Sequence, residues 1–362
     1  MGTVDKVKCP GGRSTNLELF RIISMLVIVA HHYVVNSGLI DMVYESTCLG
    51  LRDTFLLLFG WGGKTGVNCF ILITGYFMCT SEITMKKYIK LLGERYFYCI
   101  IIFLIFLVSG YDNFSLKGML KVIFPFFTVK DGFVSCFLLF YPLIPFINKL
   151  IQVMTKREHF CLMTFLLFIY TVLPSFAKAT VEFNYVTWFI VLYILAAYLR
   201  LHLHRWADNV KIWTVFTMFF LTLSWFSVVF MAGIGDRFGR REWAYFFVAD
   251  CNKILAVCTA VVSFMLFKNL KMRQNRFINM AASSTFGVLL IHANSDIMRR
   301  WLWKDTLKNR LFYNSPYLAS HAVASVLIVF CTCVVMDQIR IRMIERPVLN
   351  AMLKKVCKTK VD

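Results

Sequence analysis

The stretch LELFRIISMLVIVAHH (17–32) carries ionisable residues in an otherwise apolar run. Glu18 precedes Arg21 by three residues, and Arg21 precedes His32 by eleven. In an α-helix these spacings put the three side chains on nearly one face, with Arg21 and His32 about 16 Å apart along the axis. Histidine can act as a general base near neutral pH. The stretch therefore predicts a polar line with chemical capacity along one side of an apolar helix.

A purely structural interpretation of this helix is also available. Arg21 could reach the inner headgroups while His32 hydrogen-bonds a neighbouring helix. However, ionisable groups are costly inside a bilayer and tend to face a cavity or a substrate path. Several of them on one face favour a functional site. His31 points about 100° away from that face, and we interpret it as structural.

The composition predicts an integral membrane protein. Of 362 residues, 59% are hydrophobic and 17% charged, whereas soluble domains are about one quarter charged. Apolar stretches of roughly 17 to 25 residues recur, long enough to cross a bilayer as helices. We predict an all-α bundle of about ten transmembrane helices, near 17–38, 65–79, 96–110, 133–151, 160–176, 184–201, 212–233, 250–267, 278–293 and 318–341. Pro142 and Pro145 should kink the fourth helix, and residues 118–129 form a piece too short to span.

The distribution of basic residues predicts the orientation. If the N-terminus lies inside, the inner loops and tails hold 24 Lys and Arg, and the outer loops hold 14. Lys and Arg accumulate on the cytoplasmic side of membrane proteins, so both termini are expected to be cytoplasmic. We divide the chain into a cytoplasmic tail (1–16), a transmembrane domain (17–341) and a basic cytoplasmic tail (342–362).

The charge and cysteine content exclude other classes. The net charge of +20 is explained by inner loops that set topology and meet anionic lipids, so no nucleic-acid partner is expected. Nine of the twelve cysteines fall inside apolar segments, where cysteine behaves as a small hydrophobe. The chain has no Cys-x-x-Cys pair, which argues against a zinc site or a disulfide framework. We predict no metal.

A second cluster follows the first helix. The segment GVNCFILITGYFM (66–78) contains small residues that allow close helix contact. A basic run then contains Lys86, Lys87, Lys90 and Arg95. This run could meet lipid headgroups, or it could bind a polyanionic cytosolic cofactor.

Several motifs together resemble the acyltransferase-three family of integral-membrane O-acyltransferases. The spacing from Arg21 to His32 is similar to that family's best-known motif, and GVNCFILITGYF is similar to its second-helix pattern. FYPLIPFINKLI (140–151), ASSTFGVLLIHAN (282–294) and the closing IRIRMIERPV also resemble family segments. The motifs occur in the expected order from about residue 16 to about 348.

The resemblance implies an O-acetyltransferase of the bacterial cytoplasmic membrane. Cytosolic acetyl-CoA, or another acyl-CoA, would be the donor, with its phosphates on the basic run that begins at Lys86. The acceptor would be a hydroxyl of a cell-surface or lipid-linked polysaccharide. His32 would be the base or a transient acyl carrier. Arg21 would hold a carbonyl oxygen or a CoA phosphate, or fix Glu18. Site residues that would contact the acceptor are Tyr76, His292 and Asn294.

Two alternatives stay open. Succinyl or another acyl group could be transferred by the same mechanism, because pocket size decides the donor. The chain could also be a glycan or lipid transporter without transferase chemistry, since intramembrane charge and a kinked helix suit transporters as well. Against a transporter, the sequence shows no inverted repeat.

Overall fold

The computed structural model describes residues 14–124, 132–177, 184–203 and 205–347. These residues form helices and no β-strand. The α-helices are α1 (Thr15–Val35), α2 (Leu39–Glu45), α3 (Leu51–Gly60), α4 (Gly63–Met78), α5 (Met85–Val108), α6 (Leu116–Ile123), α7 (Phe133–Phe140), α8 (Ile144–Val153), α9 (Lys156–Leu167), α10 (Leu173–Phe176), α11 (Tyr185–Leu201), α12 (Val210–Phe238), α13 (Ile254–Asn269), α14 (Arg276–Ser283), α15 (Thr285–His292), α16 (Asp296–Arg300) and α17 (Leu318–Arg340). Short helical turns of other pitch join several of them: η2 (Tyr141–Leu143), η3 (Phe168–Val172), η4 (Arg205–Asp208), η5 (Arg241–Tyr245), η6 (Trp301–Thr306), η7 (Asn309–Phe312) and η8 (Ile341–Glu345).

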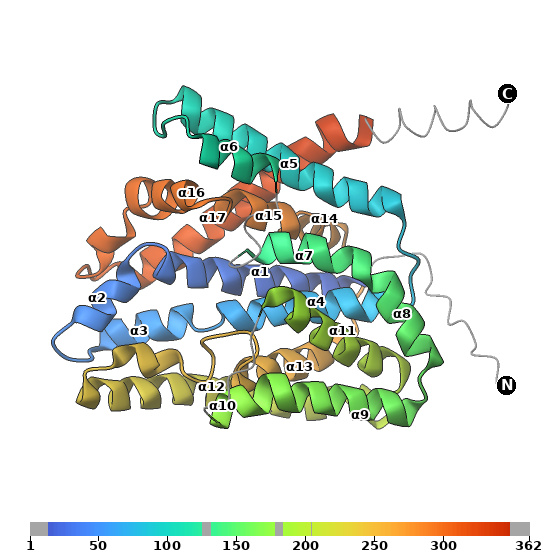
Figure 1. Cartoon of the computed structure of the whole chain (residues 1–362). Coiled ribbons are helices and arrows are strands. Elements are labelled where there is room, and N and C mark those ends of the chain that lie inside the picture. Colours follow the sequence, from blue (N-terminus) through green and yellow to red (C-terminus); the bar gives the residue numbers. More distant parts are fainter. Residues whose placement is uncertain (1–13, 125–131, 178–183, 204, 348–362) are drawn as a thin grey trace, which may run out of the picture.

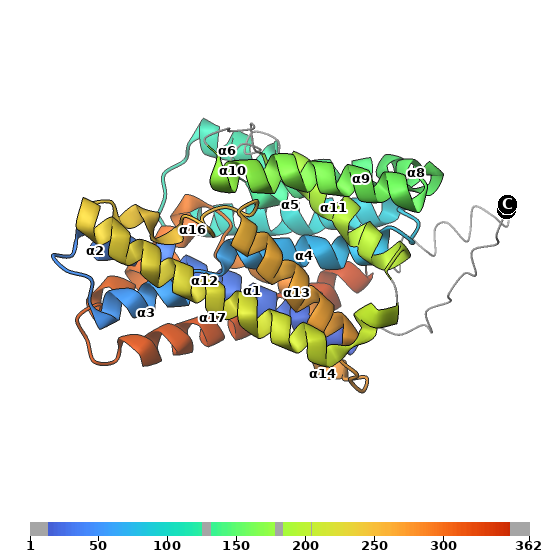
Figure 2. The same ribbon diagram turned by 90° about the horizontal axis from the view of Figure 1, so that it is seen from below.

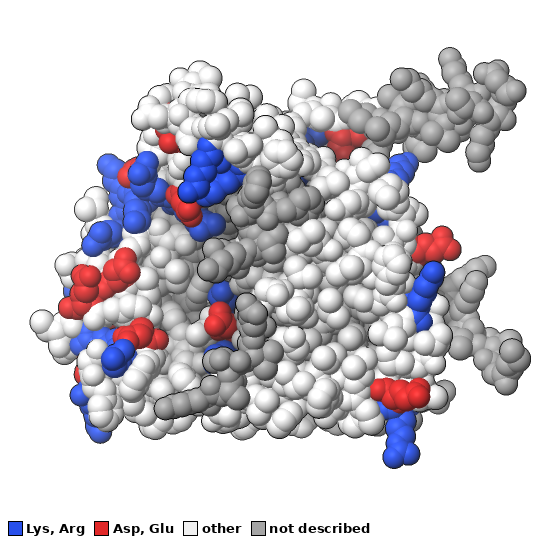
Figure 3. All heavy atoms as spheres, viewed as in Figure 1, with Lys and Arg blue, Asp and Glu red and all other residues white. Residues whose placement is uncertain are grey.

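The helices pack side by side around α1 and α4. In Figure 1, α5 and α6 lie above this central pair, and α9, α12 and α13 lie below it. Figure 2 shows α12 and α13 crossing beneath α1. On the face drawn in Figure 3, the charged side chains that can be seen gather toward the two ends of the bundle. This distribution is the one that a bilayer requires, because its hydrocarbon region disfavours charge.

The structure supports a multi-pass membrane protein and gives the lengths of its helices. Within the described residues, seven helical stretches are long and apolar enough to span: Thr15–Val35, Leu51–Met78, Met85–Val108, Phe133–Val153, Lys156–Phe176, Val210–Phe238 and Leu318–Glu345. The apolar helices α11 and α13 are shorter, and the predicted span 278–293 is divided between α14 and α15. The number of ten complete crossings therefore stays a prediction.

The predicted inner loops, with the ends of the predicted spans beside them, meet at one end of the bundle. Thr15 donates a hydrogen bond to Asn279 at 3.1 Å, and the backbone of the adjoining residue Met280 accepts one from Gln338 at 3.2 Å. Lys268 pairs with Asp208 there. The start of α1 and the end of α17 thus share this end. Which end is cytoplasmic stays a prediction.

The predicted outer loops also meet one another. Arg241 donates to the carbonyl of Val43 at 3.2 Å, and Tyr313 donates to Asp53 at 2.5 Å. Asn309 donates to the carbonyl of Tyr33 at 3.1 Å. Hydrogen bonds between segments far apart in sequence tie this second end of the bundle together.

Close contact between α1 and α4 depends on glycine. A Cβ atom at Gly66 would lie 2.8 Å from the carbonyl oxygen of Ser24, and one at Gly63 would overlap the ring of His31. Real Cβ atoms do not approach other atoms so closely. Small residues let helix backbones approach, as the sequence predicted for this segment. The contact fixes where α1 presents its histidines.

The basic run and the short piece after it take an unexpected form. Lys86, Lys87, Lys90 and Arg95 belong to α5 itself, which begins eleven residues before the predicted span of 96–110. From the far end of α5, α6 turns back along it. The guanidinium of Arg95 donates to the carbonyls of Lys121 and Val122 at the end of α6. Carbonyls at a helix end lack partners within the helix, and Arg95 supplies them.

The predicted proline kink is present between α7 and α8. Helix α7 ends at Phe140, and the short turn Tyr141–Leu143 contains Pro142 before α8 begins at Ile144. Proline lacks an N–H donor and cannot continue a regular α-helix. The rest of the predicted segment 118–129, from residue 125 onward, lies outside the described residues.

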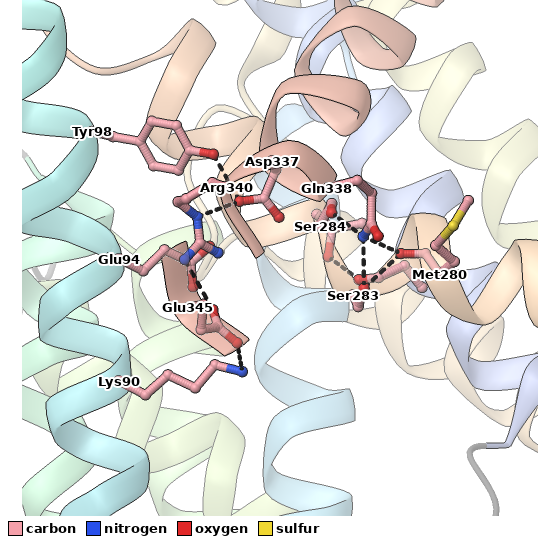
Figure 4. Close-up of polar contacts among 12 residues, drawn as sticks. Lys90, Glu94, Tyr98, Met280, Ser283, Ser284, Asp337, Gln338, Arg340 and Glu345 are labelled. Carbon is pink, nitrogen blue, oxygen red and sulfur yellow. Dashed lines mark hydrogen bonds and ion pairs between the residues drawn. The ribbon is translucent and has the colours of Figure 1, made fainter. Parts of the chain in front are cut away.

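A buried ion cluster joins α5 to α17 and η8 (Figure 4). Arg340 is its centre, 2.8 Å from Asp337, 3.2 Å from Glu94 and 2.9 Å from Glu345. Tyr98 donates to Asp337 at 2.8 Å. Buried charges are stable only when they are paired and hydrogen-bonded, so this cluster fixes the last helix against α5. We call it the Arg340 cluster.

Candidate active site

A cavity of about 1250 Å³ runs through the bundle beside α1. Its lining comes from α1, α4, α5, α6, α7, η2, α11, α14, α15 and α16 and from the loops between them. It extends along α1 from Arg21 to Asn36, a distance of about 22 Å at the rise of an α-helix. The cavity therefore reaches from near one end of the bundle to near the other.

Helix α1 presents one regular face to this cavity. Arg21, Met25, Ile28 and His32 all line it. Their spacings of four, three and four residues follow the helical repeat. The sequence prediction that Arg21 and His32 share a face is confirmed, since both border one space. His31 borders it too, although its Nδ1 lies 2.6 Å from the carbonyl of Gly60.

His32 forms a hydrogen bond with a second histidine. Its Nδ1 lies 2.9 Å from Nε2 of His292, and Nδ1 of His292 lies 2.6 Å from the carbonyl oxygen of Val288. His292 is fully buried, and it does not line the cavity but lies behind His32. The two rings come from α1 and α15, 260 residues apart in sequence.

The order of donors and acceptors in this series of hydrogen bonds sets the tautomer of His32. A carbonyl oxygen can only accept, so Nδ1 of His292 carries the hydrogen. Nε2 of a neutral His292 then accepts from Nδ1 of His32. Nε2 of a neutral His32 is left with its lone pair, and no described residue hydrogen-bonds to it. Because His32 borders the cavity, a ligand there can reach this nitrogen.

Arg21 and Glu18 form an ion pair at the other end of the cavity. Their side chains lie 3.1 Å apart. Arg21 borders the cavity, whereas Glu18 is buried behind it. The predicted pairing between these residues is present. Glu18 holds the guanidinium on the face of α1 that also carries His32.

The four basic residues of α5 do not gather around one point. Lys86 is exposed, Lys87 donates to the carbonyl of Glu82 at 2.9 Å, and Lys90 pairs with Glu345 at 2.6 Å. Among them Arg95 alone lines the cavity, and its guanidinium holds the end of α6. The first three lie at the end of the bundle where the predicted inner loops meet.

Of the three residues expected to contact the acceptor, Asn294 lines the cavity. Its side chain donates to the carbonyl of Leu290 at 2.9 Å. Tyr76 is buried, and its hydroxyl accepts from Arg200 at 2.6 Å, so it lies in a polar contact between α4 and α11 and not along the cavity. His292 orients His32, which is a different role from contact with a substrate.

Seven charged residues at the cavity escaped the sequence-based prediction: Lys64, Glu94, Asp112, Lys117, Lys121, Asp296 and Arg299. Glu94 belongs to the Arg340 cluster. Lys64 lies two residues before the segment 66–78, whose small residues predicted close helix contact. This position is the one sequence signal that could have placed Lys64 near the site. Within the described ranges, no group of three or more His, Cys, Asp or Glu side chains is arranged to hold a metal ion.

The fold and the site define a multi-pass membrane protein with a histidine pair beside an internal cavity. A family model described as an acyltransferase domain matches residues 14–337, so the chain belongs to the acyltransferase-three family. It is accordingly a membrane acyltransferase. No curated protein and no solved structure matches the chain.

Proposed function

We propose that this acyltransferase moves an acetyl group from cytosolic acetyl-CoA to a hydroxyl of a cell-surface or lipid-linked polysaccharide. The membership of the family supports acyl transfer. The cavity supports a reaction between substrates that arrive from opposite ends, because it extends along α1 from Arg21 to Asn36. The proposed location is the bacterial cytoplasmic membrane, with the Arg21 end on the cytosolic side.

The observation that carries this proposal is the hydrogen-bond order through the two histidines. A hydroxyl is a weak nucleophile at neutral pH and needs a base within hydrogen-bond reach. His32 offers the lone pair of Nε2 at the cavity wall, and His292 holds the ring from behind. A base oriented by a third group is the arrangement of hydrolytic triads, with a neutral histidine here in the place of their carboxylate.

The chemical step balances with these groups. Nε2 of His32 takes the proton of the acceptor hydroxyl as its oxygen attacks the thioester carbonyl carbon. The tetrahedral intermediate collapses, the carbon–sulfur bond breaks, and the CoA sulfur receives the proton from His32. If His32 instead carries the acyl group, the same lone pair attacks the thioester carbon, the carbon–sulfur bond breaks and CoA leaves as its thiolate. In a second step the acceptor hydroxyl attacks the acyl-imidazolium, His32 returns to its neutral form, and the hydroxyl proton passes to the thiolate. Both routes need Nε2 unprotonated at the start.

The donor is proposed to enter at the Arg21 end. A guanidinium binds phosphate or carbonyl oxygens with two parallel hydrogen bonds, and Arg21 borders the cavity on the proposed cytosolic side. Lys86, Lys87 and Lys90 lie at that same end, where CoA phosphates would meet them. Arg95 is already engaged with α6, so we assign it to positioning α6 and not to primary phosphate binding.

Mass spectrometry of surface glycans tests the proposal. Cells producing the wild type, His32→Ala or Arg21→Ala at matched protein levels are compared with cells producing His202→Ala, which changes a histidine outside the cavity. We expect an acetyl mass increment with the wild type and His202→Ala, and its loss with His32→Ala. A succinyl increment would name the other donor.

Two outcomes would contradict the proposal. Acylation by His32→Ala at the wild-type level would remove His32 from the mechanism. A fall in total exported glycan with unchanged acylation per sugar would favour the transporter. Acetyl transfer from isotopically labelled acetyl-CoA by the purified protein in nanodiscs would then separate the enzyme from the transporter directly.

A further inference from the structure

Two cationic side chains flank the His32 end of the cavity. Lys64 comes from α4 and Arg299 from α16, and both line the cavity together with His32. They are 235 residues apart in sequence and reach this place only in the folded bundle. Neither residue takes part in the acyl-transfer step proposed above.

Lys64 retains hydrogen-bonding capacity toward the cavity. Its ammonium donates to the hydroxyl of Tyr185 at 2.8 Å and lies 3.8 Å from a carboxylate oxygen of Asp250. An ammonium has three N–H donors, so these contacts leave at least one. Asp250 is about half exposed, and the pull of an exposed carboxylate on a cation is weak.

Arg299 shows a clearer deficit. Its only ion pair among the described residues is with Asp296, at 3.1 Å, and Asp296 is 90% exposed. Its Nε atom is buried and has no hydrogen-bond partner among them. A buried donor without a partner is costly and rare in folded proteins. The terminal nitrogen Nη1 donates to Asp296, and Nη2 has no hydrogen-bond partner among the described residues, so a ligand in the cavity can accept from Nη2.

The cavity wall favours a negatively charged ligand. Its described lining includes six Lys or Arg and three Asp or Glu residues. Glu94, one of those acids, is bound to Arg340. Lys and Arg side chains also gather at the surface over α16 and beneath α6 (Figure 3). Positive charge along a cleft with low-dielectric walls attracts anions.

We propose that Lys64 and Arg299 form an anion-binding subsite for the acceptor, which is therefore a glycan substrate that carries a negatively charged group. This inference rests on the proposed acyl transfer and names its substrate class. The subsite holds the acidic group while a hydroxyl of the same molecule reaches Nε2 of His32. The anion is either the carboxylate of an acidic sugar or the phosphate of a lipid-linked sugar. Both bind a guanidinium through two oxygens.

Binding to the intact protein in nanodiscs tests the subsite without any turnover. The probes are D-glucuronate for a carboxylate, D-glucose 1-phosphate for a phosphate, and D-glucose as the neutral control. We expect at least one anion to bind about tenfold more tightly than glucose. Arg299→Gln should abolish that preference, and Lys64→Gln should reduce it. The matched control is Arg300→Gln, since Arg300 is exposed and does not line the cavity.

The two anions distinguish the sources of the negative charge. A preference for glucuronate indicates an acidic sugar, and a preference for glucose 1-phosphate indicates a lipid-linked phosphate. If neither anion binds more tightly than glucose, or if Arg300→Gln removes the preference as fully as Arg299→Gln, the subsite is overturned.

Kinetics separate this inference from the proposed function. Arg299→Gln should raise KM for an acidic acceptor about tenfold and leave KM for acetyl-CoA unchanged. An equal fall in kcat on acidic and neutral acceptors would make Arg299 an oxyanion stabiliser, and a raised KM for acetyl-CoA would make it a donor contact; both results refute the subsite. His32→Ala should still prefer the anion while it fails to transfer acetyl. Loss of transfer chemistry and loss of anion binding are therefore seen independently.

Discussion

The Arg340 cluster and the His32 end of the cavity use polar residues in opposite ways. In the Arg340 cluster, each charged side chain has an oppositely charged protein partner within 3.2 Å, and Arg340 is only 6% exposed. At the His32 end, a lone pair on Nε2 and a donor on Arg299 have no described protein partner. Both regions lie among apolar helices.

The contrast separates structural charge from functional charge. Paired charges hold helices together, as Arg340 does with three carboxylates, even though Glu94 Oε1 and Asp337 Oδ2 accept no hydrogen bond among the described residues. Groups that keep unused donors and acceptors beside a cavity are costly to the fold, and a bound substrate can offset that cost. Substitutions in the two regions should therefore be distinguishable: one region controls stability, and the other controls turnover.

The largest expected effect is that of His32→Ala on turnover. General-base catalysis contributes about 100- to 10,000-fold, so the rate of acetyl transfer should fall by that factor. The protein should still fold, because alanine suits a helix. Rates with labelled acetyl-CoA and the melting temperature in detergent measure the two properties. A large fall in the melting temperature would show that His32 stabilises the fold, as the charges of the Arg340 cluster do.

Removing the centre of the Arg340 cluster should mainly reduce stability. Arg340→Met leaves Glu94 and Asp337 buried without their cation, which costs about 3–5 kcal/mol for a broken buried pair. Thermal unfolding in detergent should show a strongly lowered midpoint. The matched control is Arg342→Met, since Arg342 is two residues further along the chain and exposed. An inactive Arg340→Met protein with an unchanged unfolding midpoint would contradict this division, because Arg340 would then control turnover and not stability.

Substitution of His292 should give an intermediate effect. His292→Phe removes the acceptor for Nδ1 of His32, and a misplaced catalytic group can cost about 100-fold. We expect kcat to fall by about that factor with KM for both substrates nearly unchanged. His292→Gln offers an amide oxygen as acceptor and should restore part of the rate. If glutamine restores nothing, His292 does more than orient its neighbour.

The smallest effect is expected at the edge of the Arg340 cluster. Lys90 pairs with Glu345 at 2.6 Å, but the lysine side chain is 48% exposed. Ion pairs open to solvent contribute about 0–1 kcal/mol. Lys90→Met should therefore lower the melting temperature little and leave acetyl transfer intact. A marked rise in KM for acetyl-CoA would instead support the predicted contact of Lys90 with CoA phosphates.

Local periodicity allowed much of the fold and part of the site to be predicted. The apolar runs located the helices, and Pro142 marked the break after α7. Arg21 and His32 could be assigned to one face because a single helix carries both, and helical geometry fixes that relation without knowledge of any neighbour. The small residues of 66–78 likewise predicted close contact with another helix, and the structure identifies that helix as α1.

The remaining parts depend on tertiary contacts that no local pattern encodes. Lys64 and Arg299 meet only because α4 and α16 border one cavity. Tyr76 lies on the predicted helix, but Arg200 on α11 holds its hydroxyl. The extent of α5 was missed because its first turns are basic, and hydropathy alone does not distinguish a polar helix end from a loop. The orienting role of His292 could not be predicted, because only the folded structure places its ring against His32.

The contact between Gly63 and His31 has a consequence for how this site can vary among descendants of the chain. Even the smallest side chain at position 63 would overlap the imidazole of His31, so every single replacement of Gly63 should disturb the packing of α4 against α1. A change at position 63 becomes tolerable only after position 31 has first become smaller. The two positions should therefore mutate in a fixed order. The close spacing of α1 and α4, which positions His32, cannot then change through single substitutions at position 63.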